Sequence, residues 1–441
     1  MPMLSGSYDL AMRFLRRASP PFAGGSSKLA RGIGGRTNAL DVLGAWAGAN
    51  RDESRPLIWM HAPSVGEGLQ AKVVFEELLK ERPSVQSVYT FFSPSAESFG
   101  EAFPAGVSGY LPWDIRSDLR ELISVLAPGL VSFTNTEVWP GLTQVAVDDG
   151  IPVVLCAATL PRGSGRLRPG ARSLLTPTFR ALSKVLTISE EDGERFTRLG
   201  VSPDRIQVTG DPAIDSAHRR AAGADPHATY LSPFHEDPRR TLVAGSTWPS
   251  DEAMLVPVLR ELVDRFPGFR SIVAPHEPSA GHLDRLETAA RAEGLNTIRL
   301  AEVEERGDAA GFDLVLVDRV GVLVHLYTVG SFAYVGGGFR RAGLHSVLEP
   351  AAAGAALLFG PRHGRSRAAR DLIRLGGGQA VTTGPDLVTV LSGWLEDEER
   401  GLEIGAKARG YVDQHIGAAE RTARAIAGYL PTEAIGNGVQ V

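Results

Sequence analysis

This chain has a single cysteine, Cys156, among its 441 residues, so no disulfide bond can form within it. Disulfides stabilise mainly secreted proteins, and their exclusion here favours a reducing compartment. The run Val153-Val154-Leu155-Cys156 is apolar, so we expect the thiol to be a small buried group of a core.

Long apolar runs are also missing. No window approaches the roughly 18–20 consecutive apolar residues of a membrane-spanning helix. The arginines near the start of the chain are not followed by the continuous apolar region that a secretory signal requires. The sequence therefore predicts neither a membrane span nor a secretory signal.

The first 50 residues are nevertheless basic and partly apolar. Their charged side chains are Arg13, Arg16, Arg17, Lys28, Arg31 and Arg36 against Asp9 and Asp41. Four apolar side chains lie among these cations: Leu10, Met12, Phe14 and Leu15. A short basic amphipathic helix of this kind can rest on an anionic membrane surface. A solvated helix followed by a flexible linker at residues 19–27 fits the same pattern.

Charge of one sign is not in large excess. The net charge of −5 at pH 7 gives no overall reason to expect a nucleic-acid partner. With 43% hydrophobic and 22% charged residues, the composition is that of a folded globular protein. A length of 441 residues exceeds one ordinary core and predicts two to three domains.

Several nucleotide-binding and metal-binding patterns are absent. No G-x-G-x-x-G opens the first half, and Gly336–Gly338 is not followed by the Lys-Ser/Thr of a P-loop. Histidine, cysteine and carboxylate residues do not cluster at metal-ligand spacings, so we expect no metal centre.

Apolar segments alternate with helical patterns from residue 56 to 210. The expected strands are Leu57–His61, Val85–Phe92, Leu130–Thr134, Ile151–Ala157 and Val185–Ile188. A helical segment, Gly68–Arg82, follows the first strand and carries apolar residues four positions apart. Short apolar strands separated by helices predict a parallel, doubly wound sheet.

The alternation stops over residues 211–240, which are rich in proline and small polar residues and indicate an interdomain connection. It then resumes with expected strands at Thr241–Ala244, Ser271–Ala274, Leu314–Val317, Phe332–Val335 and Ala355–Phe359. Two Rossmann-like α/β halves indicate the GT-B architecture, in which two domains face a cleft. A ligand would lie at the carboxyl ends of both sheets.

The stretch Ile58–Glu67 reads as a buried strand, a short turn and the start of a helix. A carboxylate in that first helical turn is placed to take a proton from an incoming hydroxyl, so Glu67 is a candidate general base. Ser64-x-x-Glu67 is equally the pattern of a capping box. The two roles are compatible, because a helix N-terminus favours the ionised carboxylate.

Two loops of the second half are candidates for a nucleotide site. Ser246 and Thr247 follow a strand and precede a helix that begins near Pro249, where hydroxyl and N–H groups suit a phosphate. Pro275 and His276 end the next strand, where a histidine reaches a phosphate or a base. The alternatives are an ordinary N-cap and a surface histidine.

A third loop has the strongest pattern, Gly336-Gly337-Gly338 followed by Gly343-Leu344-His345-Ser346-Val347-Leu348-Glu349. A glycine-rich turn lets the backbone approach a ligand, and the helix start that follows favours an anion. Glu349 is placed to accept hydrogen bonds from the ribose hydroxyls of a nucleotide, unless Ser346-x-x-Glu349 forms a capping box.

These motifs together resemble those of the Kdo (3-deoxy-D-manno-octulosonic acid) transferases of lipopolysaccharide and lipid A biosynthesis. The family signature H-x-x-S-V-G-E corresponds to His61–Glu67, and the resemblance extends over most of the chain. Further matching segments follow in the same order: Tyr110–Asp114, Thr136–Pro140, Ser189–Gly193, Val208–Gly210, Gly321 with Leu326-Tyr327, and the Gly336–Glu349 region with Phe359-Gly360-Pro361.

The resemblance implies a glycosyltransferase that transfers Kdo from CMP-Kdo to a lipid A precursor, lipid IVA, with inversion and without a metal. CMP-Kdo is then a substrate, and no cofactor is implied. Glu67 would deprotonate the acceptor hydroxyl, with Asn135 and Glu137 as support for the transition state. The implied donor-binding residues are Ser246, Thr247, Pro275, His276, Gly321, Gly337, Gly338, Ser346, Val347, Leu348 and Glu349.

On this interpretation the chain has four parts. These are a membrane-associating segment at residues 1–50, an acceptor domain with the catalytic glutamate at 51–215, a linker at 216–240 and a CMP-Kdo domain at 241–441. The protein would lie peripherally on the cytoplasmic face of a bacterial inner membrane. Its expected partners are CMP-Kdo, a lipid A precursor and an anionic membrane surface, without nucleic acid.

Several positions depart from the family pattern. The family's Glu-Thr-Glu-x-Trp begins with a glutamate that supports the transition state, and Asn135 stands there. Where the family usually has a basic residue after Val208–Gly210, this chain has Ala213. The family's Asn-Pro is replaced by Ser346-Val347, and the acidic residue that commonly follows Gly321 is replaced by Val322. The usual long apolar N-terminal anchor is missing. Three alternatives stay open: a related transferase with another acceptor or ulosonic-acid donor, a nucleotide-sugar epimerase, and a non-catalytic binding relative.

Overall fold

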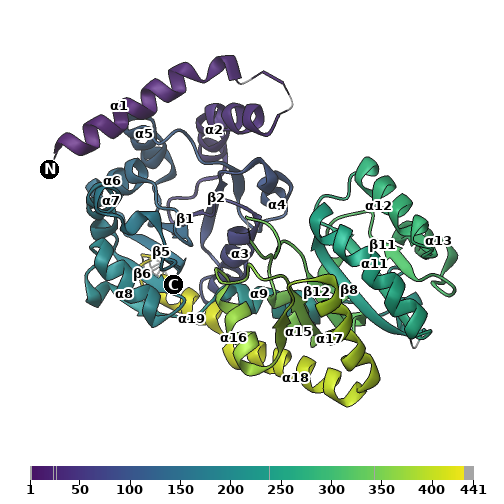
Figure 1. The fold of residues 1–441 in the computed structure, drawn as a ribbon. Coiled ribbons are helices and arrows are strands. Elements are labelled where there is room, and N and C mark those ends of the chain that lie inside the picture. The colour runs from purple at the N-terminus through teal and green to yellow at the C-terminus, as the bar shows by residue number, and fades with distance from the viewer. Residues whose placement is uncertain (1, 23, 26, 238, 342, 432–441) are drawn as a thin grey trace, which may run out of the picture. The chain divides into compact units, whose positions relative to one another are not determined.

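The computed structural model describes residues 2–22, 24–25, 27–237, 239–341 and 343–431, with side chains from residue 6 onward. The chain divides into two compact units, Met1–Asp215 with Gly417–Val441, and Ser216–Ile416. Each unit is built on one parallel seven-stranded sheet with helices connecting the strands (Figure 1). The predicted α/β class with two Rossmann-like halves is therefore confirmed.

The first sheet has the strand order β3-β2-β1-β4-β5-β6-β7. Its strands are β1 (Leu57–His61), β2 (Gln86–Phe91), β3 (Val107–Tyr110), β4 (Leu130–Thr134), β5 (Val153–Ala158), β6 (Lys184–Thr187) and β7 (Ile206–Val208). Every residue of β1 is buried, because successive side chains enter opposite cores. Leu57 and Trp59 pack on one face of the sheet, and Ile58 and Met60 pack on the other.

Helices cover both faces of this sheet. They are α1 (Pro2–Ala18), α2 (Lys28–Asn50), α3 (Val65–Glu81), α4 (Glu97–Glu101), α5 (Arg116–Leu126), α6 (Pro140–Asp148), α7 (Pro169–Ala181), α8 (Glu190–Leu199) and α9 (Pro212–Ala222), which crosses the unit boundary. Within α2, Leu43 and Ala47 are buried in the core of the unit. Residues 28–50 are thus an integral part of the first unit and not a separate segment, as the boundary at residue 50 had suggested.

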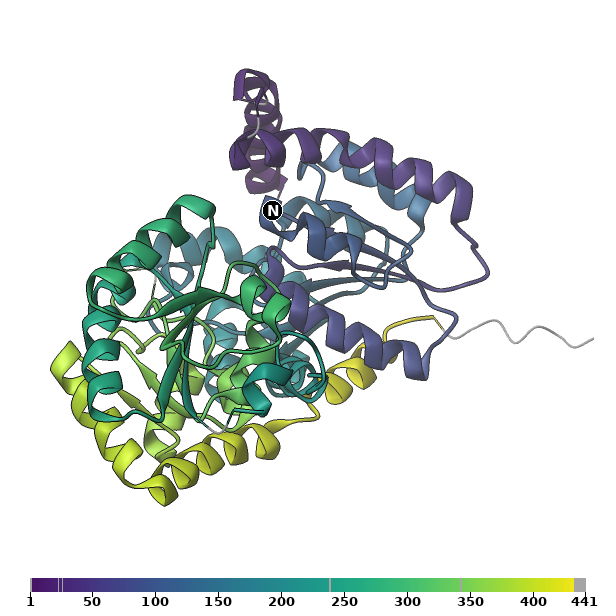
Figure 2. The ribbon, with the colours of Figure 1, turned by 90° about the vertical axis from the view of Figure 1, so that its right-hand side faces the viewer.

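The end of the chain returns to the first unit. Helix α19 (Ala418–Ala427) packs against α3, and both figures show the yellow α19 beside it (Figures 1 and 2). Ala419, Ala423 and Ile426 are fully buried in the same cluster as Val74 of α3. The second domain, predicted at residues 241–441, therefore ends at Ile416. Helix α19 belongs to the first unit, because its apolar face fills the core beneath α3.

The second sheet has the order β10-β11-β9-β8-β12-β13-β14. Its strands are β8 (Arg240–Thr247), β9 (Phe269–Pro275), β10 (Thr297–Arg299), β11 (Leu314–Leu316), β12 (Phe332–Val335), β13 (Ala356–Phe359) and β14 (Gly378–Ala380). Its helices are α10 (Ser232–His235), α11 (Pro249–Arg265), α12 (Ala280–Ala292), α13 (Leu300–Arg306), α14 (Leu323–Leu326), α15 (Leu348–Ala353), α16 (Arg367–Leu375), α17 (Gly384–Glu396) and α18 (Glu398–His415).

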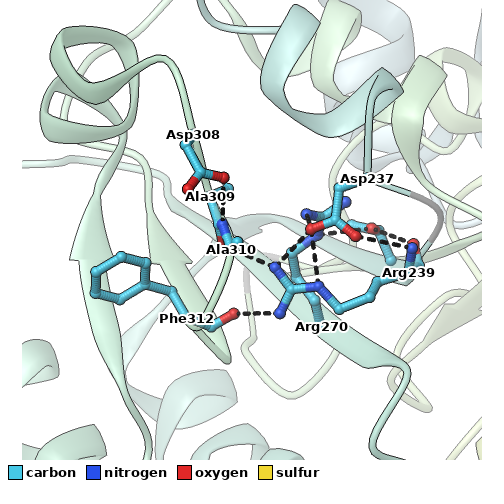
Figure 3. Close-up of polar contacts among 8 residues, drawn as sticks. Asp237, Arg239, Arg270, Asp308, Ala309, Ala310 and Phe312 are labelled. Atoms are coloured by element: carbon cyan, nitrogen blue, oxygen red, sulfur yellow. Dashed lines mark hydrogen bonds and ion pairs between the residues drawn. The ribbon is translucent and has the colours of Figure 1, made fainter.

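The predicted linker ends in an ion-pair network at the amino edge of the second sheet (Figure 3). Asp237 accepts hydrogen bonds from Arg239 of the linker and, at 2.9 Å, from Arg270 of β9. Arg239 also donates to the carbonyl groups of Ala309 and Phe312. Arg270 is fully buried, and burial lowers its pKa to about 10, so it still carries a charge that Asp237 compensates. The network thus holds the start of β8 against β9 and β11.

Four strands were not predicted: β3, β7, β10 and β14. All four lie at sheet edges and have three or four residues. An edge strand is covered on fewer sides, so its side chains are only partly buried and show no continuous apolar run. The ten interior strands were predicted to within three residues at each end.

Candidate active site

Glu67 lies in the first turn of α3, which begins four residues after the carboxyl end of β1. Ser64 is the N-cap residue, yet its side chain makes no hydrogen bond to the helix backbone. Its hydroxyl instead donates to Oε2 of Glu67. The capping box does not form, because the serine is used to orient the carboxylate. Burial first, and the charge of Glu67 second, raise the pKa of the neighbouring Tyr89.

A second polar group follows β4, the strand beside β1. Oε1 of Glu137 accepts a hydrogen bond of 3.0 Å from Trp139 Nε1 and lies 3.6 Å from His61 Nε2. His61 is fully buried at the end of β1, and its Nδ1 lies 3.1 Å from the Thr90 hydroxyl. Its Nε2 has no hydrogen-bond partner among the described residues. The sheet therefore brings an unpaired imidazole nitrogen towards the Glu137 carboxylate.

Asn135 lies at the end of β4 with a positive φ of 72°. Asparagine tolerates this left-handed conformation better than most side chains do. Its backbone N–H donates to Cys156 at 2.8 Å, and its side-chain oxygen accepts from Thr136 at 3.2 Å. The residue that replaces the family glutamate is thus held by the strand end, with an amide instead of a carboxylate.

The three candidate segments of the second unit lie at the carboxyl ends of β8, β9 and β12, which are neighbours in the sheet. Ser246 and Thr247, predicted to follow a strand, are the last two residues of β8. The backbone N–H of His276 donates to Thr247, and that of Gly336 donates to Gly245. The sheet therefore brings together the three loops that the sequence singled out. Ser246 has a positive φ of 52°, whereas the hydroxyl of the buried Thr247 donates to Glu252.

Glycines 336 to 338 are required by the packing of these loops on one another. A Cβ at Gly336 would lie 2.2 Å from the carbonyl oxygen of Ser246. A Cβ at Gly338 would lie 2.5 Å from the backbone nitrogen of Gly360, and Gly337 has a φ of 87°. No other residue type fits these three positions without displacing backbone.

Asp251, in the first turn of α11, was not predicted as a site residue. It is fully buried and accepts 3.0 Å hydrogen bonds from the backbone N–H groups of Trp248 and Gly337 and from the Tyr334 hydroxyl. One carboxylate thus ties the start of α11 to the glycine-rich loop. The feature that could have identified Asp251 in the sequence is its position two residues after Pro249, at the expected start of a helix.

Three rings stack beside these loops. The His276 ring lies 4.7 Å from Trp248 and 4.4 Å from His345, and Arg340 lies 3.6 Å above Trp248. Trp248 Nε1 donates to Nε2 of His345 at 2.9 Å. Burial, together with the charges of His276 and Arg340, lowers the pKa of His345 to about 4. His345 is therefore neutral at pH 7, and the stack offers flat rings beside one permanent cation.

The segment Ser346–Glu349 is arranged differently from the prediction. The helix that follows, α15, has Val347 as its N-cap, so Ser346-x-x-Glu349 does not form a capping box. The side chains of Val347 and Leu348 are buried, which leaves only their backbone groups for a ligand. Glu349 pairs with Arg220 of α9 at 2.5 Å, and a ribose would have to share that carboxylate.

Two predicted donor residues lie at the margins of this group. Pro275 is the buried last residue of β9, directly before His276. Gly321 follows β11 with a φ of 95° and faces open space, since a Cβ there would meet no atom within 4 Å. Trp248, Arg340 and Arg220 were missed, because their contacts join segments far apart in the sequence. Within the described part of the chain, no three His, Cys, Asp or Glu side chains are arranged to share a metal ion.

Comparison with known proteins places the chain among its relatives. A family model described as 3-deoxy-D-manno-octulosonic-acid transferase (kdotransferase) matches residues 41–216. The 3-deoxy-D-manno-octulosonic acid transferase of Bordetella pertussis is 29% identical over 391 residues, covering 85% of this chain and 87% of the relative. That of Rickettsia felis is 26% identical over 379 residues, covering 84% and 77%.

Residues 41–216 thus match the Kdo transferase family model, and the relatives extend that similarity over about 85% of the chain. The resemblance drawn from its motifs is confirmed, and with it the prediction of a glycosyltransferase. The matched region of the family model covers β1 to β7 and contains Glu67, Asn135 and Glu137.

Solved structures are similar to this chain in fold. A putative UDP-N-acetylglucosamine 2-epimerase from Listeria monocytogenes superposes with a TM-score of 0.60 at 13% identity, covering 84% of this chain and 95% of that one. At such an identity the likeness concerns the fold alone, and it does not favour an epimerase. The GT-B fold class is confirmed.

Proposed function

We propose that this protein transfers Kdo from CMP-Kdo to a lipid A precursor, lipid IVA, with inversion at the anomeric carbon and without a metal ion. The observation that carries the proposal is Glu67, a partly exposed carboxylate at a helix start that Ser64 orients. Glu67 takes the proton of the acceptor hydroxyl while that oxygen bonds to the anomeric carbon of Kdo. The bond to CMP breaks, and CMP leaves with its electron pair.

The donor site in this proposal is the group of loops after β8, β9 and β12. Backbone N–H groups beside Ser246 and Ser346 face the CMP phosphate, with Arg340 as the nearby cation. The rings of Trp248 and His276 provide a face on which a base or sugar stacks. Glu349 reaches the ribose hydroxyls while it remains paired with Arg220.

Helix α1 supports the proposal that the protein works peripherally at the cytoplasmic face of the inner membrane. Leu10, Phe14 and Leu15 are 69%, 70% and 52% exposed, although they are large and apolar. Arginines 13 and 17 flank them on the same helix. Apolar side chains beside cations suit an anionic bilayer surface. No helix in the described ranges is long and apolar enough to cross a membrane.

The decisive experiment is transfer of Kdo to lipid IVA, with CMP-Kdo generated in situ and the products identified by mass. A product heavier by one or more Kdo units is expected, and the anomeric configuration of the new linkage tests inversion. Unchanged turnover in EDTA is expected of a metal-independent reaction. A chain that binds CMP-Kdo but forms no product would be a binding relative, for which Asn135 is the motivating departure.

Glu67→Gln tests the assigned base. The amide cannot accept the proton, so transfer should fall by about a hundredfold or more, while CMP-Kdo binding stays nearly intact. Glu76→Gln, on the same helix, is the matched control and should keep full activity. Turnover of Glu67→Gln at the level of that control would contradict the assignment.

A further inference from the structure

A basic cavity of about 720 Å³ lies in the first unit, between α1 and α2. Four of its lining residues are arginines, Arg13, Arg16, Arg17 and Arg36, against one carboxylate, Asp118. Arg13 pairs with Asp9 at 2.7 Å, and Arg16 pairs with Asp118. Arg17 makes no hydrogen bond or ion pair with any residue that the structure describes. The cavity therefore has cationic groups in excess.

Arg36 is the unusual member of this set, because it is only 7% exposed. Its guanidinium lies 5.0, 4.7 and 4.8 Å from the ring centroids of Phe92, Trp113 and Trp139. It donates one hydrogen bond, of 3.1 Å, to the carbonyl of Pro112, and its Nε has no partner among the described residues. Burial lowers the pKa of Arg36 to about 10, so the side chain is charged at neutral pH.

A buried cation normally has an anion in contact, because desolvation is costly. No described carboxylate lies within ion-pair distance of Arg36; the charges of the buried Asp114 and of Glu137 act on it from further away. Three aromatic rings hold the guanidinium in place while leaving its hydrogen-bonding capacity largely unused. Such an arrangement is pre-organised for an anion that arrives with the ligand.

The surroundings favour an anion with an apolar part. Leu10, Phe14 and Leu15 lie exposed on α1, the helix that supplies three of the four arginines. The three rings around Arg36, here called the ring cage, belong to Phe92, Trp113 and Trp139, which follow β2, β3 and β4. The ring cage therefore lies at the carboxyl ends of the strands, where α3 with Glu67 also begins. A ligand here would have a charged head near the reacting edge and apolar chains beside α1.

We propose that this cavity binds a phosphate monoester of the lipid acceptor, with Arg17 and Arg36 as its main contacts; the choice of a lipid acceptor rests on the proposed function. A phosphate monoester is close to a dianion at neutral pH and has three acceptor oxygens. Guanidinium groups match such oxygens in pairs, which lysine does not. The phosphate neutralises the excess positive charge of the cavity, and the exposed apolar side chains of α1 contact the acyl chains of the lipid.

The first test compares vesicles of phosphatidylcholine that contain either phosphatidic acid, a phosphomonoester, or phosphatidylglycerol, a phosphodiester. The full chain and the variant Arg17→Gln/Arg36→Gln are measured by co-sedimentation, with Arg172→Gln/Arg120→Gln as the matched control. Both control arginines are exposed, lie in the same unit and do not line the cavity. The cavity variant should lose about tenfold in affinity for phosphatidic acid vesicles. Equal losses in both double variants would overturn the proposal, since only general surface charge would then act.

Two further measurements complete the design. Arg17→Gln alone involves an exposed side chain, so it retains the fold and shows part of the loss even where Arg36→Gln unfolds the unit. Inorganic phosphate should compete with phosphatidic acid vesicles for the wild-type chain only weakly, because it lacks the apolar part. Full competition at equal phosphate concentration would overturn the lipid part of the inference and make the cavity a site for free phosphate.

The transfer assay separates this inference from the proposed function. Arg17→Gln should raise the KM for lipid IVA several-fold and leave kcat nearly unchanged, because the cavity binds and does not react. If the wild type transfers Kdo and Arg17→Gln has an unchanged KM, the proposed role of the cavity is overturned while the proposed function stands. If no transfer occurs but Arg17→Gln still weakens binding to phosphatidic acid, the proposed function is overturned while phosphate binding in the cavity stands.

Discussion

Ser64 and Glu67 bond to each other, although their spacing is that of a helix cap. The consequence is a carboxylate with one oxygen fixed by a neutral donor and the other available. A hydrogen bond to a charged group is worth roughly 1.5–3 kcal/mol. The orientation of the assigned base therefore depends on Ser64, whose side chain the sequence pattern had assigned to capping the helix backbone.

Ser64→Ala should lower kcat for Kdo transfer by about tenfold or more, because Glu67 loses the donor that orients it. CMP-Kdo affinity should not change, since both residues belong to the first unit. Steady-state kinetics of the purified variant would show this. A kcat equal to that of the wild type would mean that the serine does not position the base.

His345 offers a test by pH. Its Nε2 accepts a hydrogen bond from Trp248, and its pKa of about 4 lies below the ordinary value near 6.5. Between these values the unfolded chain binds the proton and the folded chain does not. The stability that neutral His345 contributes is therefore fully present above pH 6.5 and is lost as the pH falls towards 4.

His345→Gln keeps a hydrogen-bond acceptor for Trp248 but does not titrate. Urea unfolding between pH 7 and 4 should show a shallower decrease of the unfolding free energy for this variant than for the wild type. Identical slopes would contradict the assignment of a neutral, partly buried His345.

At the scale of elements, α1 buries Met12 against Trp113 and Ile115 but leaves other large apolar side chains exposed. Its inward side is anchored by polar groups: Tyr8 donates to the buried Asp114 at 2.8 Å, and Arg16 pairs with Asp118. Its outward side presents Leu10 and Phe14. Hydrophobic periodicity predicted the helix but not its orientation, because the inward contacts come from residues more than a hundred positions away.

Leu10→Ser/Phe14→Ser should weaken binding to anionic vesicles by tenfold or more, since burying each such side chain contributes roughly 1.5–3 kcal/mol. The melting temperature should hardly change, because both side chains are exposed. Deleting the first 20 residues would also weaken binding, but it removes Tyr8 and Met12 from the unit as well. Vesicle binding that is indifferent to the double substitution would exclude α1 as the membrane contact.

On the scale of the whole molecule, the chain leaves the first unit after Asp215 and returns to it at Gly417. The return is held by Asp215, which accepts hydrogen bonds from the backbone N–H groups of Gly417 and Ala419 at 2.6 and 3.1 Å. Helix α19 then packs on α3, whose first turn carries Glu67. Helix α19 thus supports the helix of the assigned base.

Ile426→Ala should reduce the unfolding free energy of the first unit by about 2–5 kcal/mol, because it opens a cavity in a fully buried cluster. Leu402→Ala, at a residue of α18 that is 67% exposed, is the control and should change it by less than about 0.5 kcal/mol. Denaturant unfolding of both variants would decide. Equal, small effects would show that α19 contributes little to the unit.

Much of this protein follows from local sequence alone. Buried parallel strands need continuous apolar runs, so the ten interior strands, the two α/β halves and the loops at their carboxyl ends could be read directly. The motif at His61–Glu67 is likewise local. The glycines 336 to 338 could be recognised in the sequence, although the close contacts that require two of them come from Ser246 and Gly360. These determined the fold class, the family resemblance and the position of the assigned base.

Only the tertiary structure decided which side chains meet. The edge strands, the return of α19, the pairing of Glu349 with Arg220, the stack on Trp248 and the ring cage around Arg36 all join segments far apart in the chain. A local pattern reports whether a residue is buried, because burial depends on polarity and periodicity. It does not report the partner, since that depends on which distant elements the sheet order places side by side.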